Sequence, residues 1–194
     1  MEKEFFNFLK NAYTSGLCSE YRDEIRSCHG DKLQLVRLAM RQQSIPYVAT
    51  KMADGVITKE YAMNNFGEYM NGVVLKDCDD VPDYTYSWYM DYPYDNAIVV
   101  ETDVCHVSHT KDKDIVIQET KCPILYISNH SKVSLVCEGY NSVRVYLFDD
   151  SELNVEDTDI DSTITVFKYS DKCSVEEGRF CFAKVKSFNK ELKL

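Results

Sequence analysis

The sequence predicts an α+β fold, in which a small N-terminal helical unit precedes a C-terminal β-solenoid of about 20 residues per rung. The main observation is a five-residue pattern of polar, charged, apolar, polar and apolar residues that recurs in the second half of the sequence. The middle apolar residues of this pattern are Val133, Leu153 and Cys173, and Leu192 is the corresponding residue of a partial fourth copy. The pattern therefore recurs about every 20 residues. Such a period is expected when each rung buries its inward residues on the rung below. A β-sandwich is the alternative for the same strands.

Charge is distributed unevenly along the chain. Residues 1–76 hold 9 acidic and 10 basic side chains, for a net charge of +1. Residues 77–194 hold 23 acidic and 12 basic side chains, for a net charge of −11. Direct binding of nucleic acid needs clustered lysine and arginine, so the acidic second part argues against it. A surface of this kind favours a basic protein partner.

Residues 1–76 are expected to form five short helices. Phe5, Leu9 and Tyr13 recur four positions apart and form the apolar stripe of a first helix. A second helix is expected around residues 20–28. Asp31 is placed to cap a third helix, because its short carboxylate side chain can accept hydrogen bonds from the free N–H groups of the first turn.

A fourth and a fifth helix complete this unit. Pro46 fits the first turn of the fourth helix, which Gly55 ends. Thr58 is placed to cap the fifth helix, which ends before Gly72. A unit of this size has a small core, so we expect it to pack on the second half as a cap over one end of the stacked strands.

Residues 77–95 are expected to connect the two units. Four aspartates surround Pro82, which is typical of a turn or a polar connection. The connection closes with the most aromatic stretch of the chain, from Tyr84 to Tyr94. If this stretch is extended, alternate residues such as Tyr86 and Trp88 lie on one face.

The solenoid is expected to cover residues 96–194. Short apolar runs alternate there with turn signals such as Asn129-His130 and Asp149-Asp150. The predicted strands are Ile98–Val100, Cys105–Val107, Ile115–Ile117, Ile124–Ile127, Val133–Val136, Val143–Leu147 and Ile164–Phe167.

The sequence also favours an intracellular location. No basic start followed by an apolar segment marks a signal peptide, and no apolar run is long enough to span a bilayer. We therefore expect a cytoplasmic protein without membrane contact. The eight cysteines include no Cys-x-x-Cys pair, which predicts free thiols, and a disulfide framework is the alternative.

Several short motifs resemble those of a group of uncharacterised small proteins from phages and mobile elements of gut bacteria. The group has no established activity, so the resemblance implies a phage or mobile-element setting inside a bacterial host cell and supplies no catalytic residue. The resemblance extends over nearly the whole chain and is carried by Gly16-Leu17-Cys18-x-Glu20-Tyr21-x-Asp23, Cys28, Leu38-Ala39, Phe66, Asn71-Gly72, the strand repeats and the closing residues 189–194.

One acidic turn has the residue types that bind a hard cation. Asp157, Asp159 and Asp161 alternate, and their oxygens could surround Ca²⁺. The glycine and the glutamate that a helix-loop-helix calcium loop requires are missing, because Ser162 and Lys168 stand in their places. A solvated acidic turn accounts for the same residues.

The second candidate metal is zinc, whose candidate ligands are Cys105, His106 and His109. A zinc site needs three or four ligands, and on a strand the two histidines point to opposite faces. No second cluster has ligand spacing. No cofactor is therefore expected.

Catalytic motifs are also missing from the sequence. There is no Gly-x-Ser-x-Gly elbow and no glycine-rich phosphate loop. Glycan cleavage needs carboxylates that converge on one groove, for which Asp149, Asp150 and Asp171 are the candidates. Few rungs are available for such a groove, so we do not expect an enzyme.

The aromatic stretch is the most plausible contact surface, because tyrosine and tryptophan are enriched at interfaces. The alternative is that these rings fill the junction between helices and strands. The expected binding surface consists of Tyr84, Tyr86, Trp88, Tyr89, Tyr92, Tyr94, Asp149 and Asp150.

Together these observations predict a non-enzymatic protein that binds another macromolecule. The specific version is an acidic inhibitor of a host nucleic-acid-binding defence protein, whose carboxylates imitate phosphates. One alternative is a structural or assembly component of a phage particle, in which a homo-oligomer is compatible with stacked strands. The other is a small carbohydrate-binding or carbohydrate-active β-helix protein.

Overall fold

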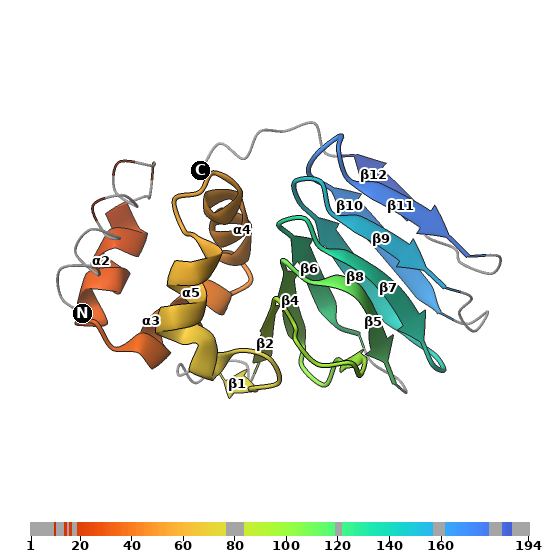
Figure 1. Ribbon diagram of the computed structural model, residues 1–194, viewed down its shortest axis with the longest axis horizontal. Helices are drawn as coiled ribbons and strands as arrows, with labels where there is room; N and C mark the ends of the chain where they lie inside the picture. Colours follow the sequence, from red (N-terminus) through yellow and green to blue (C-terminus); the bar gives the residue numbers. More distant parts are fainter. Residues whose placement is uncertain are drawn as a thin grey trace.

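The computed structural model describes residues 19–76, 84–118, 122–156, 162–178 and 184–187, together with the single positions 10, 14 and 16. Helices come first along this part of the chain and strands follow (Figure 1). The predicted α+β fold with a C-terminal β-solenoid is therefore confirmed. Of the first predicted helix, around Phe5 to Tyr13, only Lys10 belongs to the described residues, and it is helical.

The predicted helices after residue 19 are all present. None of the helices in the described part is long and apolar enough to cross a membrane. They are α2 (Ser19–Ser27), α3 (Lys32–Met40), α4 (Ile45–Ala53) and α5 (Lys59–Phe66), and the short 3-10 helix η1 (Gly67–Tyr69) follows α5.

Local sequence explains where these helices begin and end. The Asp31 carboxylate accepts a hydrogen bond from the Gln34 N–H at 3.1 Å, and the Thr58 hydroxyl accepts one from the Tyr61 N–H at 3.1 Å. Pro46 lies in the first turn of α4, where the missing N–H costs no helical hydrogen bond. The backbone turns away after α4 at Gly55, whose φ of +71° favours glycine.

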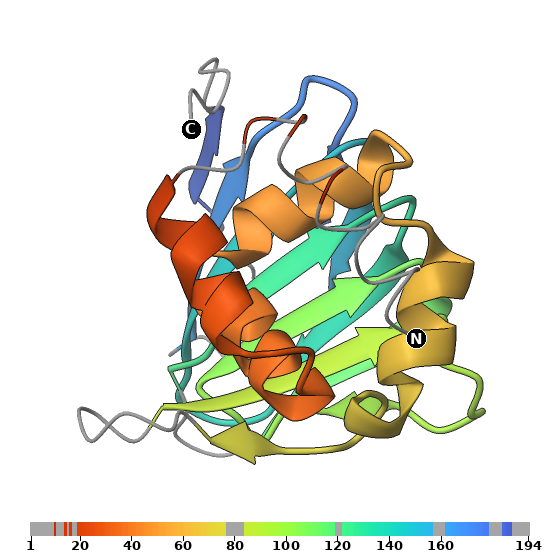
Figure 2. The same cartoon turned by 90° about the vertical axis from the view of Figure 1, so that its left-hand side faces the viewer.

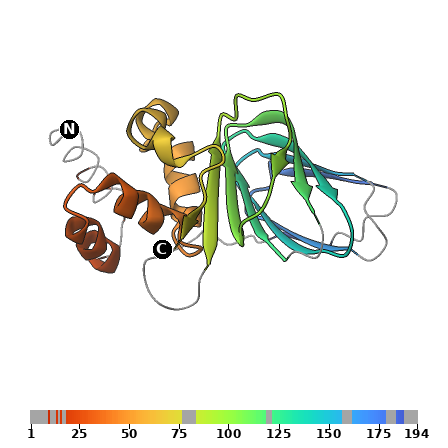
Figure 3. The same cartoon turned by 90° about the horizontal axis from the view of Figure 1, so that it is seen from below.

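The strands form two sheets, which lie face to face (Figure 3). Sheet A has the order β1-β2-β4-β6-β8-β10-β12, and sheet B has the order β11-β9-β7-β5-β3. All pairs are parallel except β1 with β2. The bounds are β1 Leu75–Lys76, β2 Thr85–Met90, β3 Ile98–Val99, β4 Val104–Ser108, β5 Lys111–Ile117, β6 Ile124–Ser128, β7 Lys132–Cys137, β8 Ser142–Leu147, β9 Glu152–Val155, β10 Thr163–Lys168, β11 Ser174–Glu177 and β12 Lys184–Ser187.

This order defines a flattened solenoid. The chain alternates between the sheets, so each rung consists of one strand of sheet A and the next strand of sheet B. Ile124 pairs with Val104 and with Arg144, which lie one repeat before it and one repeat after it along the chain. Parallel stacking with this step matches the predicted rung and excludes the β-sandwich alternative, whose sheets are antiparallel.

The second step of the expected repeat, from Leu153 to Cys173, is wrong, and the end of the third step, Leu192, lies outside the described residues. Leu153 pairs with Val133, as the sequence period predicts, but its partner in the next rung is Val175, two positions beyond the expected Cys173. Cys173 is buried in the turn before β11. Its N–H donates to the carbonyl three positions earlier, as do the N–H groups of Ser131 and Ser151. Cys173 therefore occupies the turn position of these serines, because the chain gains one residue before β10 and a second in the turn between β10 and β11.

The solenoid begins earlier than residue 96. The aromatic stretch forms β2, and Tyr86 and Trp88 pair with Val104 and His106 of β4. Residues 77–95 therefore contain the first strand of sheet A in addition to a connection. The sequence pattern does not mark this strand clearly, because five of its six residues are buried and the alternation of a half-exposed strand is absent.

The helices pack on the outer face of sheet A and do not cap the end of the stack, which corrects the expected arrangement (Figure 2). One apolar cluster fills the space between the two sheets, with inward residues such as Val145 and Val155 at 0% exposure. A second cluster joins α3, α4 and α5 to outward residues of sheet A, among them Trp88 and Tyr126. Sheet A is thus buried on both faces over part of its width.

The cysteines follow the prediction of free thiols within the described part of the chain. Cys28, Cys105, Cys122, Cys137 and Cys173 form no disulfide, and only Cys122 of these five is exposed.

The inward and outward positions of β9 give the first prediction. Leu153 is 1% exposed between the sheets, and the next residue, Asn154, is exposed on the outer face of sheet B. Leu153→Asp should lower the free energy of unfolding by more than about 4 kcal/mol, because it buries an unpaired charge. Asn154→Asp should change it by less than about 1 kcal/mol. Urea unfolding of both variants tests the assigned faces, and equal losses would contradict them.

The shifted register gives a second prediction. Cys173→Ser should change the free energy of unfolding by less than about 1 kcal/mol, because serine is the native residue at this turn position in two other rungs. Val133→Ser should cost about 2 to 3 kcal/mol, because it removes core methyl groups and buries a hydroxyl. If Cys173 instead belonged to the column of Val133, both variants would lose stability alike in the same unfolding experiment.

Candidate functional site

Polar residues gather where the chain passes from sheet A to sheet B, a set of turns that we name the A-to-B corner. It contains Asp91, His109, Asn129 and Asp149 on four successive rungs, and their φ angles are 47°, 52°, 56° and 59°. Left-handed backbone is uncommon outside glycine, and Asn, Asp and His are the residues that tolerate it best. The turn geometry therefore selects these residue types and aligns them in one column.

Asn129 joins the corner to the helical unit. Its Nδ2 donates to the carbonyl oxygen of Ala49 in α4 at 3.0 Å and to Asp149 Oδ2 at 3.2 Å. Its Oδ1 accepts a hydrogen bond of 2.6 Å from the Ser128 hydroxyl. The side chain is 1% exposed and its amide is fully used, so its role is to hold the corner against α4.

Asp149 and Asp150, which the sequence analysis placed on a binding surface, have different environments. Asp149 is half-buried and accepts the Asn129 N–H at 3.0 Å, and burial raises the pKa of its carboxyl group against the effect of that hydrogen bond. Asp150 Oδ1 lies 2.6 Å from Nδ1 of His130, and this hydrogen bond lowers the pKa of Asp150. Both carboxylates therefore have partners within the protein.

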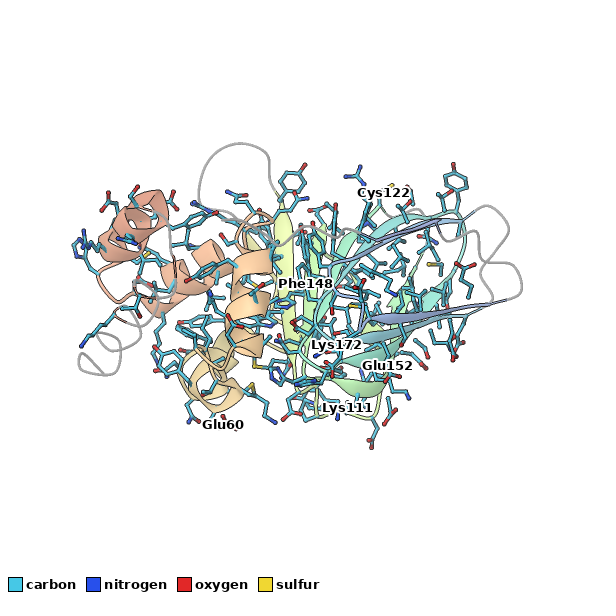
Figure 4. The ribbon with its side chains drawn as sticks, turned by 90° about the horizontal axis from the view of Figure 1, so that it is seen from above. Glu60, Lys111, Cys122, Phe148, Glu152 and Lys172 are labelled. Carbon is cyan, nitrogen blue, oxygen red and sulfur yellow. The ribbon has the colours of Figure 1, made fainter. Side chains whose placement is uncertain are left out.

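A cleft of about 430 Å³ lies beside this corner. Lys59 comes from α5 and forms an ion pair with Asp91, with 2.8 Å between Nζ and Oδ2. Figure 4 shows Lys111 on the same side of the molecule as Glu60 of α5, and Cys122 at the opposite edge of the solenoid. The cleft is lined by Lys59, Asp91, Tyr92, His109, Thr110, Lys111, Asn129 and His130.

His109 is the most perturbed group in the cleft. Burial lowers the pKa of its imidazole, and the positive charges of Lys59 and His130 lower it further. Its Nδ1 is buried, and no described residue forms a hydrogen bond with it. His109 thus lines the cleft with an imidazole whose neutral form is favoured, and its unpartnered Nδ1 is buried beneath the cleft surface.

The aromatic stretch is divided between the core and the surface. Tyr86, Trp88 and Tyr89 are at most 8% exposed, so these three are not part of an exposed contact surface, which corrects the expectation. They are buried because the helices cover one face of β2 and sheet B covers the other. Tyr84 and Tyr94 are exposed at 44% and 55%.

His106 lies beneath the helices and is not a zinc ligand. Its ring stacks on Trp88 with 5.4 Å between centroids, and its Nε2 lies 2.8 Å from the Ser128 hydroxyl. Because Ser128 donates to Asn129, its oxygen accepts from His106, which places the imidazole proton on Nε2. Among the described residues no group of three metal-ligating side chains exists, and Asp157, Asp159 and Asp161 lie outside them.

An aromatic ladder continues across the outer face of sheet A and was missed by the sequence analysis. Tyr146 stacks on Tyr126 and on Phe167, with centroid distances of 5.0 and 4.9 Å. Phe148 stacks on Tyr169 at 4.7 Å and lies between the sheet and the helices (Figure 4). Because the ring faces stack against one another, this ladder stabilises the sheet and leaves few ring faces on which a ligand could stack.

The outer face of sheet B is polar and has a different character. Lys132 and Glu152 form an ion pair of 3.1 Å, and Asn154 Nδ2 donates to the Ser134 hydroxyl at 3.4 Å. A hollow of about 220 Å³ lies over these residues. Exposed acidic side chains gather on this face on the adjacent strands β9 and β11 and directly after β9, where they are Glu152, Glu156 and Glu176, whereas Glu177 is in register with the inward-facing Val155.

Comparison with known proteins gave no match, whether to protein-family models, to curated proteins or to solved structures. The resemblance to proteins of phages and mobile elements therefore stays a prediction from the sequence.

The buried imidazole of His106 gives a prediction for pH. Burial lowers the pKa of His106 to about 3, whereas a histidine in the unfolded chain has a pKa of about 6.5. The unfolded state therefore binds more protons as the pH falls below about 6.5, and stability is lost from there toward pH 3. Between pH 7 and pH 5, His106→Phe should lose about 2 kcal/mol less unfolding free energy than the natural protein.

The measurement is urea unfolding at both pH values. Phenylalanine keeps a ring for stacking on Trp88, and His29→Asn serves as the control because His29 is exposed. The control should follow the natural protein, whereas parallel pH profiles for the natural protein and His106→Phe would show that His106 is not buried in its neutral form.

Proposed function

We propose that this protein is a non-enzymatic binding protein that recognises a basic protein partner through the outer face of sheet B. The observation that carries the proposal is the gathering of exposed carboxylates on and beside β9 and β11. Glu152 has an ion pair with Lys132, whereas Glu156 and Glu176 have none among the described residues. Uncompensated exposed charges of one sign attract a partner of the opposite sign and set its orientation.

The shape of this face also supports binding. Strands β3, β5, β7, β9 and β11 form one sheet on the side of the solenoid away from the described helices (Figure 3). Parallel strands lie about 4.8 Å apart, so side chains of neighbouring rungs are presented at regular intervals. Such a rigid surface loses little conformational entropy when a partner binds.

The corner is a weaker basis for an enzyme. The three carboxylates considered for glycan cleavage lie in turns of the same corner, but Asp149 is held by Asn129 and Asp150 by His130, and Asp171 is exposed in the following turn. The thiol of Cys173 donates to the main-chain carbonyl of Asp149 at 3.4 Å. Burial raises the pKa of this thiol to about 11, which keeps it protonated and a poor nucleophile. Binding is therefore the better supported function.

The resemblance in the sequence adds a setting to this proposal. In that setting the protein acts inside a bacterial host, and the partner is a host defence protein whose basic surface normally binds nucleic acid. Exposed carboxylates then occupy the place of phosphates on the partner. A component of a phage particle is the competing assignment, which the experiment below distinguishes.

The test is capture of a partner by tagged protein from bacterial host lysate at low and high salt. The decisive variant is Glu156→Lys with Glu176→Lys, which reverses two outward charges of sheet B. The matched control is Glu60→Lys with Glu68→Lys, which reverses two exposed charges on α5 and η1, away from sheet B. The sheet B variant should weaken capture about tenfold, and the control should change it by less than about threefold.

Salt provides the second criterion. A partner held by charge should be released at high salt, because screening shortens the range of exposed charges. A stable homo-oligomer or a captured phage structural protein that resists salt would support the assembly assignment. Capture that is equal for the two double variants would contradict the proposed face.

A further inference from the structure

The cleft beside the A-to-B corner combines basic groups in a strongly acidic protein. Four of its side chains carry nitrogen donors or potential donors: Lys59, His109, Lys111 and His130. They come from α5 and from two successive rungs, whereas the whole chain has a net charge of −10. A volume of about 430 Å³ lies within the range of small-molecule sites.

Two of the basic groups are held in place by carboxylates. Lys59 is oriented by Asp91, and His130 is oriented by Asp150 through Nδ1, so its Nε2 lies on the other side of the ring. Lys111 has no ion pair among the described residues. Lys111 and the imidazoles of His109 and His130 can therefore contact an anionic group. The orientation of His130 is set before the ligand binds.

The other walls fit the remainder of a polar ligand. Asp91 has a half-exposed side chain, which can accept hydrogen bonds from hydroxyl groups. Tyr92 is half-buried, and its ring is fixed by edge-on packing against Tyr89 at 5.5 Å and Tyr94 at 5.3 Å. An aromatic ring, a hydroxyl acceptor and cationic donors around one cleft are together suited to a sugar that carries a negative charge.

We propose that this cleft binds an anionic sugar, either a sugar acid or a sugar phosphate, with its charged group between Lys111 and the imidazoles of His109 and His130. The positive potential in the cleft also acts on His109, whose pKa is lowered by burial and, in addition, by the charges of Lys59 and His130. Asp91 and Glu60 act on His109 in the opposite direction, so the acidic groups moderate this potential without removing it.

This site is separate from the face proposed for a protein partner. The cleft lies between α5 and the corner, whereas Glu176 belongs to β11 of sheet B. Each assignment can therefore fail without the other.

The chain contains four histidines, which makes imidazole NMR signals a selective probe. Glucuronate and glucose 6-phosphate are titrated separately into the full-length protein, and glucose serves as the neutral ligand. The ring signals of His109 and His130 should shift in a saturable manner, and those of His29 and His106 should stay in place. A bound anion should also raise the pKa of His109 by roughly half a pH unit or more.

A matched pair of lysines provides the variant test. Lys111→Gln should weaken the response to the anionic sugar at least about fivefold, because it removes the cation without an ion pair. Lys132 pairs with Lys111 in the next rung but is bound to Glu152, so Lys132→Gln should leave the response unchanged. Both lysines are exposed at the start of their strands, so the two variants should fold alike.

The outcomes are distinct. A response to glucuronate alone identifies a sugar acid, and a response to glucose 6-phosphate alone identifies a sugar phosphate. An equal response to neutral glucose, an equal shift of His29, or an undiminished response of Lys111→Gln would overturn the proposal.

Discussion

The stacking of inward apolar side chains between two parallel sheets is the constraint on which the remaining structure depends. Parallel strands cannot be joined by tight hairpins, so the chain must cross from one sheet to the other in every rung. Each crossing adds a turn, and these turns align because the rungs do. The columns of Asp, Asn and His at the A-to-B corner are therefore a consequence of core packing, and both the His130–Asp150 pair and the cleft exist because of it.

The helical unit covers the aromatic side chains on the outer face of sheet A. Trp88 and Tyr126 would be exposed if the helices were absent, and they form one cluster with residues of α3 and α4. Two polar contacts make this packing specific, since Asn129 donates to Ala49 and the Tyr126 hydroxyl donates to the carbonyl of Gln42 at 3.3 Å. Sheet B lacks such a cover among the described elements and is polar outside, which is why the two faces suit different roles.

Structural features that depend on neighbouring residues or on a regular repeat could be predicted from the sequence, whereas features that depend on residues far apart in the chain could not. The caps at Asp31 and Thr58 and the regular step from Val133 to Leu153 are local or periodic, and both were predicted. The shift at Cys173 was not, because one extra residue in each of two successive connections leaves the pattern within the strands unchanged. The cleft joins Lys59 to residues far along the chain, and no local pattern reports such contacts. The burial of Trp88 was weighed but could not be decided from composition.

The two-residue strand β1 has a consequence for self-association. It pairs with β2 in the antiparallel direction at one edge of sheet A, whereas every other described pair is parallel. Unpaired strand edges template the addition of further chains, and a very short edge strand offers few backbone groups for this purpose. A second copy that continues the parallel register cannot therefore extend sheet A from this edge. The antiparallel strand β1 thus protects the first edge of sheet A. Fibre-like growth of this sheet is restricted to its opposite edge.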